Sequence, residues 1–205
     1  MGTYAAVVLA GGAARRMGGV DKPALPVGGR PMRDRVLDAV ADATPRVLVG
    51  LADAVPEGVR VTREDPPGGG PVAAAAAGLA LLDLDTALVA LLAADLPLLT
   101  RSAIGELLSE LARAGDSGER RLDGACFVDA DGRRQSLCGV WRVDALRAGL
   151  DRLAVARGGS LAGAPVRALL AGLVVRELPW SGEGPPPWFD CDTDEDVRRA
   201  EEWAR

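Results

Sequence analysis

The feature that most constrains the fold is a short apolar run leading directly into a glycine-rich loop, over residues Tyr4–Lys22. The run Ala5–Leu9 is typical of a strand buried on both faces of a sheet. The loop after it contains two glycine pairs, two arginines and Lys22. Glycines let backbone N–H groups approach a ligand closely, and cationic side chains stabilise an anion there. The pattern predicts a phosphate-binding loop; the alternative is a solvated surface turn.

Two familiar phosphate loops do not fit this stretch. A P-loop needs a Gly-Lys pair followed by Ser or Thr, whereas Lys22 lies between Asp21 and Pro23. A dinucleotide fingerprint needs G-x-G-x-x-G opening into a helix. The segment Gly11–Ala14 lacks that spacing, and Pro23 with Pro26 keeps the next residues out of a helix. The failed spacing also disfavours a Rossmann oxidoreductase.

Composition narrows the chemistry. The chain contains no histidine, which excludes Ser-His-Asp and Cys-His nucleophilic sites, histidine-ligated metals and a histidine general base. Any catalysis must then depend on carboxylates, Lys, Arg, backbone N–H groups or an oxygen-ligated metal. A net charge of −5 without a long basic stripe argues against a nucleic-acid partner. The three cysteines, Cys126, Cys138 and Cys191, lack C-x-x-C spacing and are expected to be small buried hydrophobes.

The length of 205 residues suits one α/β domain better than two. No apolar run reaches membrane-spanning length, and the N-terminus lacks the features of a signal peptide. We therefore expect a cytoplasmic protein with no membrane partner. A monomer or weak homo-oligomer is expected.

Apolar strand runs alternate with helical patterns along the chain, which predicts a three-layer, Rossmann-like, mostly parallel α/β sheet with helices on both faces. A turn at 129–132 separates two runs that read as a hairpin. Thr193 and Asp196 form a capping-box pattern at the start of the last helix. Strands are expected at 5–9, 46–50, 59–62, 87–92, 123–128, 136–141 and 173–178, and helices at 31–43, 71–82, 102–114, 143–153, within 160–170 and at about 194–204.

Acidic residues follow several of the predicted strands. Ligands of open α/β sheets bind at the carboxyl ends of strands, where Asp65, Asp95 and the pair Asp190 and Asp192 are expected. Acids that converge on phosphates need a cation, and Mg²⁺ requires only one or two carboxylates plus phosphate oxygens. Asp95 is the predicted Mg²⁺ ligand, the alternative being a loop-capping Asp before Pro97. If residues 190–192 are extended, the side chains of Asp190 and Asp192 point to the same side. They are then either ligands or acidic partners of the dipole of the last helix.

Taken together, these motifs resemble the molybdenum cofactor guanylyltransferase family of nucleotidyltransferases over nearly the whole chain. The matching segments are Leu9–Gly12, Arg16–Gly18, Asp21-Lys22, Asp65 with Gly69–Pro71, Ala94–Pro97, Gln135–Arg142 and Asp190–Asp196. The first and last of these motifs, taken together, are specific for this family. The chain departs from the family where Ser136 and Asp194 replace prolines. It also departs at Gly50-Leu51, where guanylyltransferases often carry an Asn near the base.

The resemblance implies a nucleotidyltransferase domain over 1–205, with nucleotide binding in about 1–100 and acceptor binding in about 120–192. By the same resemblance Arg16, Lys22 and Asp95 are catalytic, and Asp95 holds Mg²⁺. The implied nucleotide-binding residues are Leu9, Ala10, Gly11, Gly12, Lys22, Asp65 and Asp95, and the implied acceptor-binding residues are Gln135, Asp190 and Asp192. The implied reaction transfers GMP from GTP to the terminal phosphate of a molybdopterin-type acceptor and releases pyrophosphate.

A phosphate nucleophile is already ionised at neutral pH, so the reaction needs no general base, which suits a chain without histidine. Close alternatives keep this chemistry with another nucleoside triphosphate or acceptor: a molybdopterin cytidylyltransferase, or a nucleotidyltransferase for a sugar phosphate or phospholactate. Gly11 and Asp21 favour guanine over the cytidylyl branch. A non-catalytic nucleotide-binding regulator is the alternative from another class, and the retention of Lys22 and Asp95 argues against it.

Overall fold

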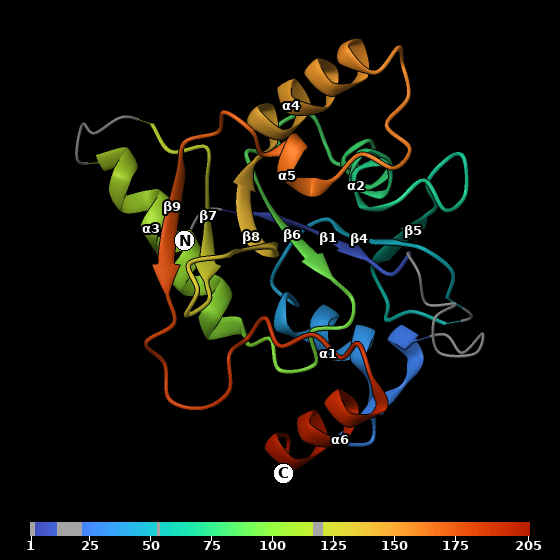
Figure 1. Cartoon of the computed structure of the whole chain (residues 1–205), viewed down its shortest axis with the longest axis vertical. Coiled ribbons are helices and arrows are strands. Elements are labelled where there is room, and N and C mark those ends of the chain that lie inside the picture. The colour runs from blue at the N-terminus through green and yellow to red at the C-terminus, as the bar shows by residue number, and fades with distance from the viewer. Residues whose placement is uncertain (1–2, 12–21, 53, 117–120) are drawn as a thin grey trace.

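The computed structural model describes residues 3–11, 22–52, 54–116 and 121–205, which form a seven-stranded sheet in the order β5-β4-β1-β6-β8-β7-β9 (Figure 1). The pairs involving β8 are antiparallel and the other neighbouring pairs are parallel. The strands are β1 (Ala5–Leu9), β4 (Arg46–Val49), β5 (Val59–Thr62), β6 (Leu88–Ala93), β7 (Gly124–Val128), β8 (Arg134–Arg142) and β9 (Val175–Pro179). The predicted mostly parallel α/β fold is confirmed.

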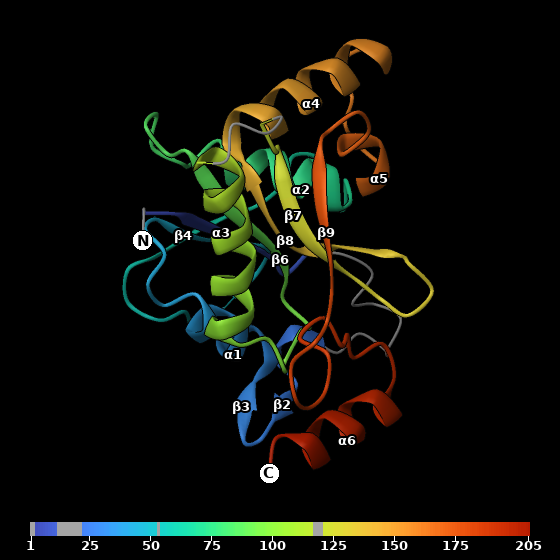
Figure 2. The same ribbon diagram turned by 90° about the vertical axis from the view of Figure 1, so that its left-hand side faces the viewer.

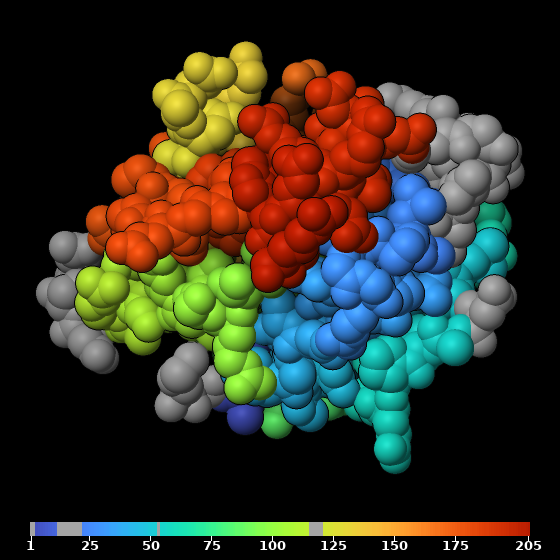
Figure 3. All heavy atoms as spheres, turned by 90° about the horizontal axis from the view of Figure 1, so that it is seen from below, coloured from blue at the N-terminus to red at the C-terminus, as the bar shows by residue number. Residues whose placement is uncertain are grey.

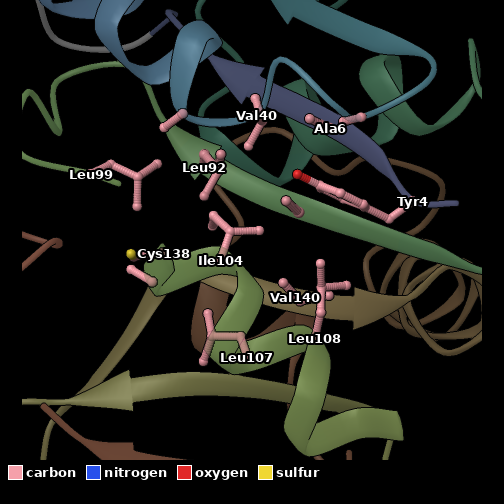
Figure 4. Packing of buried hydrophobic residues seen from close by; sticks show 14 of the residues in the cluster. Tyr4, Ala6, Val40, Leu92, Leu99, Ile104, Leu107, Leu108, Cys138 and Val140 are labelled. Carbon is pink, nitrogen blue, oxygen red and sulfur yellow. The ribbon is translucent and has the colours of Figure 1, made fainter. Parts of the chain in front are cut away.

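Helices cover both faces of this sheet, giving three layers (Figure 2). One face carries α1 (Met32–Ala39) and α3 (Arg101–Asp116), and the other carries α2 (Pro71–Leu79), α4 (Val143–Ala156) and α5 (Val166–Leu169). Alternate residues of β1 enter the two cores, as expected for a strand buried on both faces. Figure 4 shows part of the α3 side, where Ile104 and Leu107 pack over strands β6 and β8.

Several predicted helix boundaries were wrong. The helices predicted at 31–43 and 71–82 end at Ala39 and Leu79. The helix predicted within 160–170 is confirmed as α5, a single turn that begins only after Gly163, with a φ of 69°, and the extended Pro165. The hairpin of β2 (Pro26–Val27) and β3 (Arg30–Pro31) was not predicted. Its turn holds Gly28 and Gly29 at φ of 58° and 73°, as two-residue hairpins require.

The C-terminal segment returns to the carboxyl ends of the parallel strands. Helix α6 (Asp194–Trp203) begins at Thr193 with the predicted capping box. Ala200 of this helix and Cys191 pack with Val27 and Met32 in a small separate core. Seen from below, the C-terminal segment lies against the residues that follow Lys22 (Figure 3). This packing brings the acidic segment at 190–192 close to Lys22.

The cysteines are free and buried, as predicted. Burial raises the pKa of the Cys126 thiol to about 11 and that of Cys191 to about 12, so both stay protonated near neutral pH. Within the described ranges, no helix combines the length and the apolar character needed to cross a membrane.

Candidate functional site

A lysine bridges two carboxylates at the carboxyl edge of the sheet. Lys22 Nζ donates hydrogen bonds of 2.7 Å to Asp95 Oδ2 and of 2.7 Å to Asp192 Oδ1. The side chain of Lys22 is 11% exposed, whereas those of Asp95 and Asp192 are 24% and 73% exposed. Three residues that are far apart in sequence therefore meet at one point, as a shared phosphate and metal site would require.

Backbone contacts fix this cluster in place. Lys22 opens a short 3₁₀ turn, Lys22–Ala24, and Asp95 lies in the turn after β6. Ala94 N–H donates to the carbonyl of Leu9 at 3.0 Å, and Cys191 N–H donates to the carbonyl of Asp95 at 3.2 Å. The turn that carries Asp95 is thus tied both to the end of β1 and to the C-terminal segment.

The charges in the cluster are coupled. Partial burial alone would lower the pKa of Lys22, but its hydrogen bonds and charge interactions with Asp192 and Asp95 prevail and raise that pKa. Lys22 therefore stays a cation at neutral pH. The pKa of Asp190 is raised, first by loss of solvent around the carboxyl group and then by the charge of Asp192. A further cation or hydrogen-bond donor beside Asp190 would thus be stabilising.

A cavity of about 220 Å³ opens beside Asp95. Gln135 and Asp190 line it together with Asp95, so the structure brings two of the residues predicted to bind the acceptor to the same hollow. The side-chain amide of Gln135 donates to Asp129 Oδ2 at 3.1 Å and to the carbonyl of Arg133 at 3.3 Å, which holds it in place. The remaining lining residues are Ala93, Leu96, Leu137, Cys138 and Trp188.

Trp188 forms an aromatic wall of this cavity that the sequence analysis did not single out. Its ring packs on Phe127 at a centroid distance of 5.3 Å, and Phe127 meets Trp180 edge-on at 5.5 Å. A tryptophan directly after three prolines and two residues before Asp190 was the available signal. The wall suits a flat, partly apolar ligand.

The first residues of the predicted phosphate loop are held against β4. Leu9 is buried at the end of β1, and Ala10 N–H donates to the carbonyl of Val49 at 2.8 Å. Gly50 has a φ of 146°, and a Cβ there would lie 2.9 Å from the carbonyl carbon of Ala10. Only glycine fits this close approach. Gly12 and Arg16, predicted for nucleotide binding and catalysis, lie outside the described residues.

Two neighbouring acids after β5 have different surroundings. Asp65, predicted to bind the nucleotide, is exposed. Glu64 is 7% exposed, accepts a 3.0 Å hydrogen bond from Gly68 N–H and lies against Gly11. Glu64 was not predicted, and the sequence offers no signal for it: in an extended segment Glu64 shares a side with Arg60, whereas Asp65 shares a side with Val59 and Val61.

The carboxylates suit a magnesium ion that arrives with phosphate. In the described part of the chain, no three His, Cys, Asp or Glu residues form a group that could hold a metal ion. Asp95 and Asp192 nevertheless converge on one cation, the Lys22 ammonium, at 2.7 Å each. Mg²⁺ commonly takes one or two carboxylates and completes its shell with phosphate oxygens and waters. The residues therefore fit a shared metal site rather than a preformed protein cage.

Known proteins resemble this chain in sequence and in fold. The family model of the MobA-like NTP transferase domain matches residues 6–174. A molybdenum cofactor guanylyltransferase of Cereibacter sphaeroides is 34% identical over 151 residues, which cover 67% of this chain and 68% of the relative. Another protein of that name, from Cupriavidus metallidurans, is 34% identical over 135 residues, covering 63% and 64%.

Solved structures share the fold over nearly the whole chain. Molybdopterin-guanine dinucleotide biosynthesis protein A from Archaeoglobus fulgidus matches with a TM-score of 0.70 and 21% identity, covering 97% of each chain. The 2-C-methyl-D-erythritol 4-phosphate cytidylyltransferase of Thermus thermophilus matches with a TM-score of 0.67 and 19% identity, covering 99% of each chain. At these identities the two structures support the architecture, whichever base or acceptor each protein uses.

Proposed function

Because this chain belongs to the MobA-like NTP transferase family, we propose that it transfers GMP from GTP to the terminal phosphate of molybdopterin and releases pyrophosphate. The relatives at 34% identity are molybdenum cofactor guanylyltransferases. The observation that carries the proposal is the meeting of Lys22, Asp95 and Asp192 beside a cavity at the carboxyl edge of the sheet.

On the nucleotide side, Lys22 neutralises charge that develops on the departing pyrophosphate. Lys22 is the only lysine in the chain, and its raised pKa keeps its ammonium group charged. Backbone N–H groups of the loop that begins at Ala10 and Gly11 orient the phosphates. Arg16 adds a second positive charge. Asp65 stays assigned to the nucleoside side as a prediction from the family resemblance.

Asp95 would hold Mg²⁺ in this proposal, with Asp192 close enough to share the ion or its water shell. The ion would supply charge neutralisation between phosphate groups. In the described structure Lys22 occupies the position between these carboxylates. On binding of the nucleotide, Lys22 exchanges its contact with Asp95 for phosphate oxygens and can keep its contact with Asp192. The proposed catalysis therefore rests on positioning and charge rather than on proton transfer.

On the acceptor side, the cavity lined by Gln135, Asp190 and Trp188 receives the molybdopterin. Carboxylate and amide groups suit the N–H donors of a pterin ring, and the indole suits its flat face. Asp95 both lines this cavity and contacts Lys22, so the acceptor phosphate would approach at this point. The terminal phosphate is thereby directed at the α-phosphate of GTP, and no base is needed to ionise it.

Pyrophosphate release from GTP, CTP, ATP and UTP, each with molybdopterin and Mg²⁺, tests the proposal. We expect release with GTP and a rate at least about ten times lower with the others, a ratio equivalent to about 1.4 kcal/mol. Release with CTP alone would assign the chain to the cytidylyl branch. Binding of GTP without any release would instead favour a nucleotide-binding regulator.

Three further expectations stay predictions: a cytoplasmic location, a monomeric or weakly associating state, and the lack of a nucleic-acid partner.

A further inference from the structure

A single carboxylate organises the turn between β7 and β8, the yellow loop that projects from the sheet in Figure 2. Asp129 Oδ1 accepts hydrogen bonds from the backbone N–H groups of Asp131, at 3.0 Å, and of Arg133, at 2.8 Å. The carbonyl of Asp129 accepts another from Gly132 N–H at 2.9 Å, and Gly132 has a φ of 74°, as the last residue of a three-residue hairpin loop requires. One oxygen of the Asp129 side chain is therefore committed to the turn.

The other oxygen of Asp129 fixes the side-chain amide of Gln135. Gln135 Nε2 donates to Asp129 Oδ2 at 3.1 Å and to the carbonyl of Arg133 at 3.3 Å. A carboxylate and a carbonyl can only accept hydrogen bonds, so the amide must turn its NH₂ group toward them. Both N–H donors of the amide are thus used inside the hairpin, whereas its oxygen, Oε1, accepts no hydrogen bond from the described residues.

The cavity beside Asp95 therefore offers hydrogen-bond acceptors to a ligand. Gln135 lines it, and with Nε2 held in the hairpin the amide oxygen is the part left for a ligand. Asp95 and Asp190 add carboxylates to the same cavity, and Trp188 adds an aromatic face. A flat ring that presents adjacent N–H donors satisfies these acceptors, whereas a ring that presents a carbonyl oxygen leaves them without partners.

We propose that Asp129 is a positioning residue that sets the polarity of this cavity, so that the cavity selects the 2-amino-4-oxopyrimidine edge of the acceptor's pterin ring. That edge carries an amino group and a ring N–H side by side. Asp129 is not part of the cavity wall and acts through Gln135. The inference rests on the proposed function in that it takes a pterin as the acceptor. It adds which edge of the pterin enters and which residue makes the cavity selective for that edge.

The test measures binding of free pterin and of lumazine to the intact protein, without nucleotide, by ligand-observed NMR titration. Lumazine carries a carbonyl oxygen in place of the 2-amino group of pterin. We expect the intact protein to bind pterin about 10-fold or more tightly than lumazine, because a hydrogen bond to an acceptor is replaced by contact between two acceptors.

The variant Asp129→Asn should lower this pterin-to-lumazine ratio to about 2 or less while the turn stays folded. The asparagine Oδ1 can still accept from Asp131 and Arg133, but its Nδ2 donates where Asp129 Oδ2 accepted. Gln135 then turns its oxygen toward position 129 and its NH₂ group toward the cavity.

Two further variants keep the test sharp. The side chain of Asp131 is exposed and pairs with Arg133 in the same turn, so Asp131→Asn is the matched control and should keep the ratio of the intact protein. Gln135→Met removes the amide and leaves Asp129 in place, and it should lower the ratio to about 3.

Three results would overturn the proposal. Equal or undetectable binding of the two pteridines by the intact protein would do so without any mutation. An unchanged ratio in Asp129→Asn, with both pteridines bound more weakly, would make Asp129 only a brace for the turn. An equal fall of the ratio in Asp131→Asn would assign the selectivity to the charge of the hairpin rather than to the orientation of Gln135.

The outcome for the proposed reaction is separate, because no nucleotide is present in this test. Pterin-selective binding without pyrophosphate release in the assay with GTP would refute the proposed reaction and leave this inference standing. Pyrophosphate release by a protein that binds both pteridines equally would do the reverse.

Discussion

Replacing Asp95 with asparagine should lower the rate of GMP transfer by roughly 10³-fold while the protein stays folded. The amide keeps the shape of the side chain but removes the negative charge proposed to hold Mg²⁺. It also removes one of the two carboxylates that Lys22 contacts at 2.7 Å. Lys22 retains its contact with Asp192, and the backbone bond from Cys191 to Asp95 does not depend on the side chain. The loss should therefore fall on catalysis and on metal affinity.

The measurement is steady-state pyrophosphate release over a range of Mg²⁺ concentrations, with thermal unfolding as the check on folding. Asp85→Asn is the matched control, because Asp85 is exposed and precedes the opposite end of β6. It should behave like the intact protein. If Asp95→Asn turned over within about threefold of the intact protein at low Mg²⁺, Asp95 would not be the metal ligand.

Replacing Lys22 with methionine should lower kcat by about 10²–10³-fold, with a smaller effect on KM for GTP. Methionine approximates the length of the lysine stem but carries no charge. The charge of Lys22 is needed most when negative charge gathers on the departing pyrophosphate, so its loss acts mainly on kcat. No second lysine exists in the chain to substitute for it. The exposed Arg113→Met on α3 is the control for removal of a cation, and its kinetics should stay normal.

The pH dependence gives a second reading of Lys22. Its pKa in the folded protein lies above the ordinary value of 10.5. The stability that its charge contributes is therefore fully present below about pH 10.5 and is lost as the pH rises through the higher folded value. Deprotonation of Lys22 should not shape the kcat profile between pH 7 and 9. A fall in kcat in that window that disappears in Lys22→Met would contradict this assignment.

The parts of the fold that sequence could predict are those decided by local pattern. The continuous apolar runs of β1 and β6 identify strands buried on both faces, and the capping box at Thr193 identifies the start of α6. The hairpin of β7 and β8 was also predicted from its turn. The position of β8 between β6 and β7 depends instead on long-range pairing, which no local pattern specifies.

In the candidate site, too, some residues could be predicted from local pattern and others could not. Asp95 was predictable because it follows a central strand, where open α/β sheets bind ligands. The contact between Asp192 and Lys22 depends on packing of Cys191 and Ala200 against the β2–β3 hairpin, which the sequence does not reveal. Glu64 was not predicted because sequence alone does not distinguish it from the neighbouring acid Asp65. Only the direction of the chain after β5 decides which of the two side chains is buried.

The proposed reaction moves a nucleotidyl group to the acceptor phosphate. GTP labelled at the α-phosphate, incubated with molybdopterin, Mg²⁺ and the intact protein, tests it most directly. The label should leave GTP and appear in a molybdopterin product whose mass has grown by one GMP unit, with one unlabelled pyrophosphate released per product. Label recovered only as free GMP, as GDP or as unchanged GTP would contradict it.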